Sequence, residues 1–137
     1  DGYWVIRREW RAGDEIMVHL PMAIERIQAH PNVAANRGRV ALQRGPIVYC
    51  LEAVDNGGKV SNIVLPRDAD LRAEFEPDLL GGVMVIRGRA VRSPEIDWDH
   101  TLYQPAQPPA GEVDITAIPY NVWDNREAGE MAVWVTE

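Results

Sequence analysis

The sequence predicts an all-β protein, a sandwich or a barrel of about eight to ten short strands. Segments in which apolar and polar residues alternate recur along the chain, and this period of two is typical of strands that bury one face. Ten prolines and eleven glycines separate these segments, and no segment sustains a helical period. Short strands joined by frequent turns are the pattern of an all-β domain.

The expected elements begin with a hairpin. Residues 3–10 and 16–20 alternate on either side of a turn at residues 11–14. A second strand pair follows at residues 39–43 and 47–51, and the Gly45-Pro46 between them predicts a bulge or a bend at a sheet edge. The remaining expected strands, separated by turns such as the one at residues 55–58, cover residues 60–65, 71–75, 83–91, 112–118 and 130–135.

Two segments stand apart from the strand pattern. Residues 22–29 are the only helix candidate, and prolines bound them closely on both sides. Residues 104–111 contain three prolines and a glycine, which predicts a surface loop. We expect residues 21–137 to form the C-terminal sandwich domain, and we consider the hairpin of residues 1–20 a candidate for the end of a preceding sandwich.

Composition and charge exclude several classes of partner. The net charge is −7 and the pI is about 4.9, whereas a nucleic-acid partner or an anionic membrane surface requires a basic face. No apolar run approaches the roughly 20 residues of a membrane span, and no signal-peptide pattern is present. The chain begins without Met and close to a strand pattern, which we interpret as a piece of a longer protein, so the localisation is left open.

Residues with catalytic or metal-binding chemistry are few and scattered. Cys50 lies within an apolar strand, with no neighbour in the sequence that would lower its pKa, so we interpret it as a buried core residue. His19, His30 and His100 lack the close spacing of a zinc site, and the acidic cluster at residues 97–100 lacks the pattern of a calcium loop. We therefore expect no metal site and no cofactor.

Aromatic side chains give a better functional hypothesis than the carboxylates do. Many of the acidic residues fall in turns, where Asp serves backbone geometry, so no carboxylate pair stands out as catalytic. Aromatic residues in loops could stack on a sugar ring or become buried at a domain interface, and those in strands are expected in a core or an interface. The candidate sugar-binding residues are Trp98, Tyr103, Tyr120 and Trp123, and the candidate interface residues are Trp4, Ile6 and Trp10.

Two segments resemble the C-terminal portion of glycoside hydrolase family 127, the bacterial β-L-arabinofuranosidase-like proteins. The first is residues 37–52, with a Gln-Arg-Gly-Pro motif followed by Val-Tyr-Cys. The second is residues 118–135, and residues 2–14 are similar to the hairpin that ends the family's preceding sandwich. The matching positions of the second segment are Ile118-Pro119-Tyr120, Trp123, Asn125-Arg126, Gly129-Glu130-Met131 and Val133-Trp134.

This resemblance implies an activity for the parent enzyme and shows which catalytic motif is missing from this chain. Family members are expected to catalyse removal of β-L-arabinofuranose in an (α/α)6 barrel, with a cysteine nucleophile beside a zinc ion and a Cys-Cys-Pro motif. That motif is missing from this chain, so Cys50 inherits no catalytic role. We therefore predict a jelly-roll-like β-sandwich of antiparallel strands, a non-catalytic module that packs on the barrel of its parent chain or forms a homodimer. The alternative is a carbohydrate-binding module.

Overall fold

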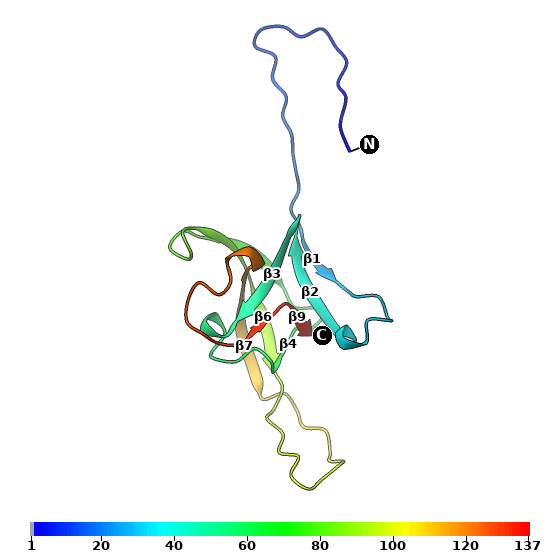
Figure 1. Ribbon diagram of the computed structural model, residues 1–137, viewed down its shortest axis with the longest axis vertical. Coiled ribbons are helices and arrows are strands. Elements are labelled where there is room, and N and C mark those ends of the chain that lie inside the picture. Colours follow the sequence, from blue (N-terminus) through cyan, green and yellow to red (C-terminus); the bar gives the residue numbers. More distant parts are fainter. Residues whose placement is uncertain (1) are drawn as a thin grey trace.

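The computed structural model describes residues 2–137, and within them it contains strands and short 3-10 turns but no α-helix (Figure 1). The prediction of an all-β, sandwich-like fold is therefore confirmed. None of these short helical turns is long and apolar enough to cross a membrane. The strands are β1 (Ile24–Ile27), β2 (Arg39–Arg44), β3 (Ile47–Glu52), β4 (Ile63–Val64), β5 (Leu71–Glu76), β6 (Val83–Arg92), β7 (Gly111–Pro119), β8 (Met131–Ala132) and β9 (Trp134–Thr136), and the 3-10 turns are η1 (Ala34–Asn36), η2 (Ala53–Asp55) and η3 (Tyr120–Val122).

Hydrogen bonding between six of the strands forms a closed circuit. The order is β2, β9, β4, β6, β7 and β3, and β3 pairs back to β2. Every pairing is antiparallel except that of β4 with β9, where Val64 lies opposite Thr136 in a parallel arrangement. Strands β1, β5 and β8 extend from β2, β6 and β3 respectively. The two layers of the sandwich are thus joined at both edges and enclose one core.

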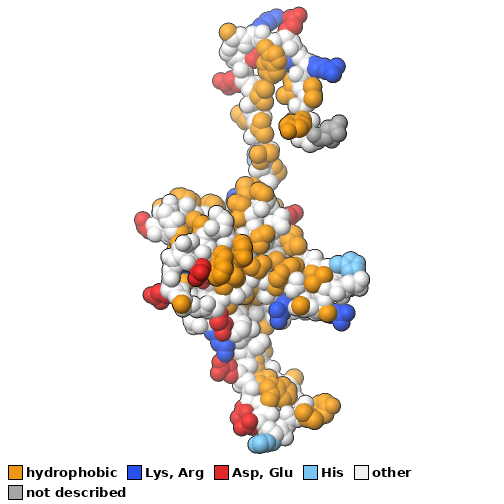
Figure 2. All heavy atoms as spheres, viewed as in Figure 1, with side chains coloured by type: hydrophobic (Ala, Val, Ile, Leu, Met, Phe, Trp, Pro, Cys, Tyr) orange, Lys and Arg blue, Asp and Glu red, His pale blue; other side chains and the backbone are white. Residues whose placement is uncertain are grey.

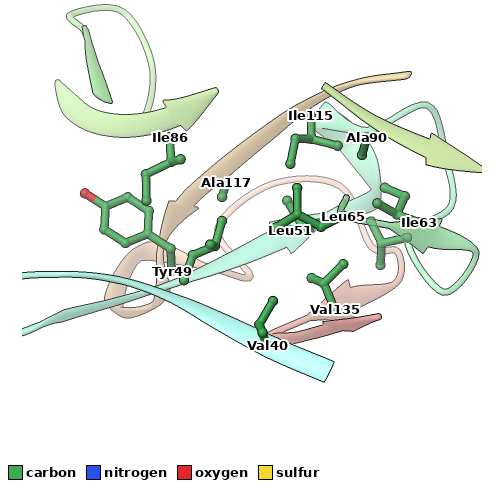
Figure 3. Close-up of a cluster of buried hydrophobic side chains, with 12 residues drawn as sticks. Val40, Tyr49, Leu51, Ile63, Leu65, Ile86, Ala90, Ile115, Ala117 and Val135 are labelled. Carbon is green, nitrogen blue, oxygen red and sulfur yellow. The ribbon is translucent and has the colours of Figure 1, made fainter. Parts of the chain in front are cut away.

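Each of the six strands contributes side chains to this core (Figure 3). Alternate residues point inward, as the pleat of a strand requires. On β3, for example, Tyr49 and Leu51 are both 1% exposed. The other strand residues of the cluster are Val40, Leu42, Ile63, Ile86, Ala90, Ile115, Ala117 and Val135, and Val60 and Leu65 complete it.

A second, smaller apolar cluster lies on the opposite face of β3, β6 and β7. Cys50, Val85 and Ile118 form its buried centre, and each directly precedes or follows a residue of the main core cluster in the sequence. These three strands are therefore apolar on both faces. Residues of the β5–β6 connection, the first residue of β6 and residues of the segment after β7 cover the outer face, namely Leu79, Leu80, Val83, Val122, Trp123, Met131 and Val133.

The predicted N-terminal strands at residues 3–10 and 16–20 are not formed. Residues 2–23 contain no strand and project from the body as an extended arm (Figure 1). The turn itself is present, because the amide of Asp14 donates a 3.1 Å hydrogen bond to the carbonyl of Arg11. An isolated two-stranded ribbon is only marginally stable without a surface against which to pack its apolar face. The arm has no such surface among the described residues.

Three further expectations need correction. The helix candidate at residues 22–29 is wrong, because β1 occupies its centre and pairs with β2. The bulge or bend at Gly45-Pro46 is instead a two-residue hairpin turn, with Arg44 opposite Ile47. Gly45 has a φ of 56°, the positive value that the first central position of such turns requires. The single strand at residues 130–135 is divided into β8 and β9, which pair with β3 and β2 respectively.

The loop between β6 and β7 agrees with the prediction. Residues 93–110 contain no strand, and they include all of the proline-rich segment 104–111 except Gly111, which begins β7. They project from the end of the molecule opposite the N-terminal arm (Figure 1). Prolines remove backbone donors, so this segment cannot extend the β6–β7 ladder.

Candidate functional site

A buried ion-pair cluster holds the segment between β7 and β8. The guanidinium of Arg126 donates to both carboxylate oxygens of Asp55, with 2.7 Å between Nη1 and Oδ1, and also to Glu52. Glu52 is the last residue of β3, and Asp55 lies in η2 directly after it. The hydrogen bond to Asp55 is the main cause that raises the pKa of Arg126 above its ordinary value. The arrangement joins three segments that are distant in sequence.

Glu52 is a charged residue with very little contact with water. It is 6% exposed, and its second carboxylate oxygen accepts a 3.0 Å hydrogen bond from the amide of Asp124. Asp124 adopts a positive φ of 61°, which is uncommon for a residue other than glycine. Glu52 therefore fixes the backbone conformation of the loop as well as the position of Arg126.

Asn56 extends this polar cluster to β7. Its side-chain amide donates to the carbonyls of Glu52 and Thr116, at 2.7 and 2.9 Å, and its side-chain oxygen accepts from the amide of Thr116 at 3.0 Å. Asn56 is 1% exposed. A buried amide needs such partners, and here they tie η2 to the middle of β7.

Glu130 secures the other end of the same segment. Its carboxylate accepts hydrogen bonds of 2.9 Å from the amides of Val60 and Ser61. These donors lower the pKa of Glu130, with Ser61 the larger contributor. The segment from Asp124 to Glu130 is therefore fixed to the body at both ends by side-chain carboxylates.

The four candidate sugar-binding residues do not form one site. Tyr120 and Trp123 are stacked, with ring centroids 6.0 Å apart, whereas Trp98 and Tyr103 lie in the loop at the other end of β7. β7 is nine residues long, which separates its ends by roughly 30 Å. Trp123 also packs against the second apolar cluster, while Tyr120 is 43% exposed. Only Tyr120 and Trp123 remain together as a candidate platform for a sugar ring.

The candidate interface residues all lie on the N-terminal arm. Trp4 is 95% exposed, and Ile6 and Trp10 are about half exposed. The guanidinium of Arg8 lies 5.2 Å from the ring centre of Trp10. Figure 2 shows hydrophobic side chains along the arm, away from the body. These side chains have no partner surface among residues 2–137, and their role in an interface stays a prediction.

The chemistry of the remaining candidates is limited. Cys50 is 1% exposed, and burial, reinforced by the charge of Glu52, raises its pKa to about 12, so the thiol is protonated at neutral pH. Residues 2–137 hold no group of three or more His, Cys, Asp or Glu side chains arranged for a metal ion. A surface hollow of about 550 Å³ beside β5, β6 and β7 is lined by charged residues, including Arg72, Arg87 and Asp114, and by no aromatic ring.

Sequence reasoning missed the cluster of Glu52, Asp55, Asn56 and Arg126. Asp55 was expected to serve only turn geometry, and Arg126 appeared only as part of the family-like segment. Arg126 is 71 residues from Asp55 and 74 residues from Glu52, so no local spacing signals these ion pairs. The one available hint was a charged residue, Glu52, at the end of an apolar strand.

The fold and these clusters define an all-β domain in which buried charged side chains such as Glu52 and Arg126 pair with one another and hold its own loops in place. Comparison with known proteins identifies the family to which this domain belongs. The profile of the Glycoside hydrolase family 127 C-terminal domain matches residues 24–136, and the chain belongs to this family. The suspected family relationship is thereby confirmed.

Three relatives illustrate the similarity. A non-reducing end β-L-arabinofuranosidase of Bifidobacterium longum is 42% identical over an alignment of 130 residues that covers 90% of this chain and 20% of that protein. The crystal structure of a family 127 β-L-arabinofuranosidase from Geobacillus stearothermophilus has a TM-score of 0.76 and 60% identity, over 85% of this chain and 18% of that one. A solved glycoside hydrolase gives a TM-score of 0.75 and 36% identity, over 84% of this chain and 19% of that one. The chain thus spans about a fifth of the length of these proteins.

Proposed function

We propose that this chain is a non-catalytic structural module of a β-L-arabinofuranosidase-like glycoside hydrolase. In this proposal its N-terminal arm packs against the rest of the parent chain, which carries the catalytic (α/α)6 barrel. The name of the Bifidobacterium longum relative and the family match support the parent activity. The arm supports the packing role.

The exposure of the arm is the observation that carries this proposal. Tyr3, Trp4 and Met17 are 89 to 95% exposed. Further large apolar side chains are exposed on the same extended stretch, residues 2–20. Apolar and polar residues alternate on both sides of the turn at residues 11–14, so one face of a hairpin would be apolar. Burial of this face would contribute roughly 25 cal/mol per Å² before the costs of association are subtracted.

The polar chemistry of the body supports a structural rather than a catalytic role. The best-buried carboxylate, that of Glu52, is engaged by Arg126 and by the amide of Asp124. The thiol of Cys50 is enclosed and protonated. Neither group has the exposure that a reacting residue needs, so we expect no hydrolysis of arabinofuranosides by this chain alone.

The test uses the full-length parent enzyme. Hydrogen exchange should show slow exchange at the backbone amides of residues 3–20, and Trp4→Ser should raise their exchange rate and lower the melting temperature. Arg7→Ser, an exposed polar position on the same arm, serves as the control and should have little effect. Fast exchange of residues 3–20 in the unmodified enzyme would contradict the proposal.

A carbohydrate-binding module is the second candidate function. The stacking of Tyr120 on Trp123 and the partial exposure of Tyr120 favour it. Titration with arabinose-containing oligosaccharides tests it, with Tyr120→Ala as the variant that should abolish binding. Absence of binding by the unmodified protein would leave the structural role alone.

A further inference from the structure

Arg44 is a half-buried cation whose side chain forms no hydrogen bond to an oxygen atom of residues 2–137. The other half-buried arginines are Arg26, Arg87, Arg92 and Arg126, and each of them donates to at least two oxygen atoms. The only hydrogen-bond acceptor for Arg44 within residues 2–137 is the thioether of Met22, 3.9 Å from Nη1. Its Nε is enclosed and unpaired. Sulfur of this kind is a weak acceptor, so the guanidinium is left largely uncompensated.

Tyr49 has a second unpaired group beside Arg44. Tyr49 is 1% exposed, and its hydroxyl has no hydrogen-bond partner among the described residues. Burial raises the pKa of Tyr49, while the nearby charge of Arg44 partly offsets this effect. Figure 3 shows the hydroxyl at the margin of the core cluster, directed away from Leu51 and Ala117. The Nε–H group of Arg44 and the O–H group of Tyr49 thus both lack an acceptor among residues 2–137, which native proteins generally avoid.

The location of the pair connects it with the N-terminal arm. Arg44 is the last residue of β2, and Gly45 begins the turn to β3. A Cβ atom at Gly45 would lie 2.9 Å from the terminal methyl of Met22, so the base of the arm rests on this turn. Figure 1 shows the arm leaving the body at the β2–β3 turn. A segment of the parent chain that packs against the base of the arm would therefore lie close to Arg44.

We propose that Arg44 and Tyr49 bind an Asp or Glu side chain supplied by the part of the parent chain outside residues 1–137. A carboxylate matches the fork of donors on a guanidinium and can also accept from the tyrosine hydroxyl. It would neutralise a charge that has no ion-pair partner among residues 2–137. This inference rests on the proposed packing role and names one residue pair through which the packing is specified.

The primary test is a structure of the full-length parent enzyme. We expect a carboxylate oxygen within about 3.5 Å of a guanidinium nitrogen of Arg44, from a residue outside this chain. A site occupied only by water or by backbone carbonyls would overturn the inference. If the arm is nevertheless buried against the parent chain, the proposed function stands and only the Arg44 assignment fails. An arm exposed to solvent in that structure would contradict both.

Variants of the full-length enzyme give an independent readout. Arg44→Met keeps most of the side-chain length and removes the charge, so the exchange rate of amides in residues 2–23 should rise about tenfold. Arg44→Lys keeps the charge but lacks the forked N–H donors of the guanidinium, so it should give a smaller increase in exchange rate. Tyr49→Phe removes only the hydroxyl and should also give a smaller increase. Arg39→Met, an exposed position on the same strand, is the matched control. Equal exchange in Arg44→Met and the unmodified enzyme would overturn the inference.

Discussion

Arg126 and Glu52 form a buried ion pair although they are 74 residues apart in sequence. Their side chains are 18% and 8% exposed, and the same guanidinium also binds Asp55. This pair holds the connection between β7 and β8 against the end of β3. The loop that carries the most recognisable family segment is therefore shaped by contacts with a distant strand.

Removal of the Arg126 charge should strongly destabilise the domain. Arg126→Met leaves Glu52 buried without its cation, and breaking a buried pair in this way costs about 3 to 5 kcal/mol of unfolding free energy. Urea unfolding followed by tryptophan fluorescence measures the change. Arg89→Met is the control, because Arg89 pairs with Glu112 at the surface and such pairs contribute at most about 1 kcal/mol. Equal losses in the two variants would show that the buried cluster is not stabilising.

Asn56→Ala tests the bridge from η2 to β7. The substitution leaves the amide of Thr116 and the carbonyl of Glu52 without their partner, so we expect a loss of roughly 2 to 3 kcal/mol. Asn121→Ala, at an exposed position in η3, should change stability little. The comparison uses the same urea titration. An unchanged unfolding midpoint for Asn56→Ala would mean that water replaces the amide without cost.

Cys50 should make stability fall at alkaline pH. Burial raises the pKa of the thiol from 9.0 to about 12 in the folded state, so the unfolded chain loses this proton first as the pH increases. The unfolded state then binds fewer protons, and the free energy of unfolding should decrease by up to roughly 1.4 kcal/mol per pH unit between pH 9 and pH 12. Well below pH 9 the thiol is protonated in both states and contributes no pH dependence.

The measurement for Cys50 is the difference between two pH profiles. Cys50→Ala removes the thiol, so its stability should decline less steeply in this range than that of the unmodified protein. All other titrating groups are common to both proteins and cancel in the difference. Parallel profiles would show that the thiol ionises as easily in the folded state as in the unfolded chain.

The isolated chain of residues 1–137 should self-associate through its N-terminal arm. Trp4, Ile6 and Trp10 are exposed and have no partner surface among the described residues. Size-exclusion chromatography with light scattering should give a mass that increases with protein concentration, and the triple substitution of these residues by Ser should restore a monomer. If the unmodified chain stays monomeric at high concentration, the result would count against an interface role for these side chains.

Much of the fold could be predicted from local patterns. The strands β2, β3, β5, β6 and β7 lie where apolar alternation placed them, since that alternation reflects which side of a sheet is buried. The pattern failed where no partner strand exists, as at residues 3–20, and where pairing overrode a local preference, as in β1. Alternation also could not show that β3, β6 and β7 are covered on both faces.

The sequence by itself determined the all-β class, the proline-rich loop at residues 104–111 and the family resemblance, because each depends on residue type and local order. Only the tertiary structure decided that Arg126 meets Glu52 and Asp55, that Tyr120 and Trp123 are separated from Trp98, and that Arg44 has no oxygen partner within residues 2–137. The physical reason is the same in each case. Strand pairing brings together residues that are far apart along the chain, and a sequence pattern of period two specifies faces but not neighbours.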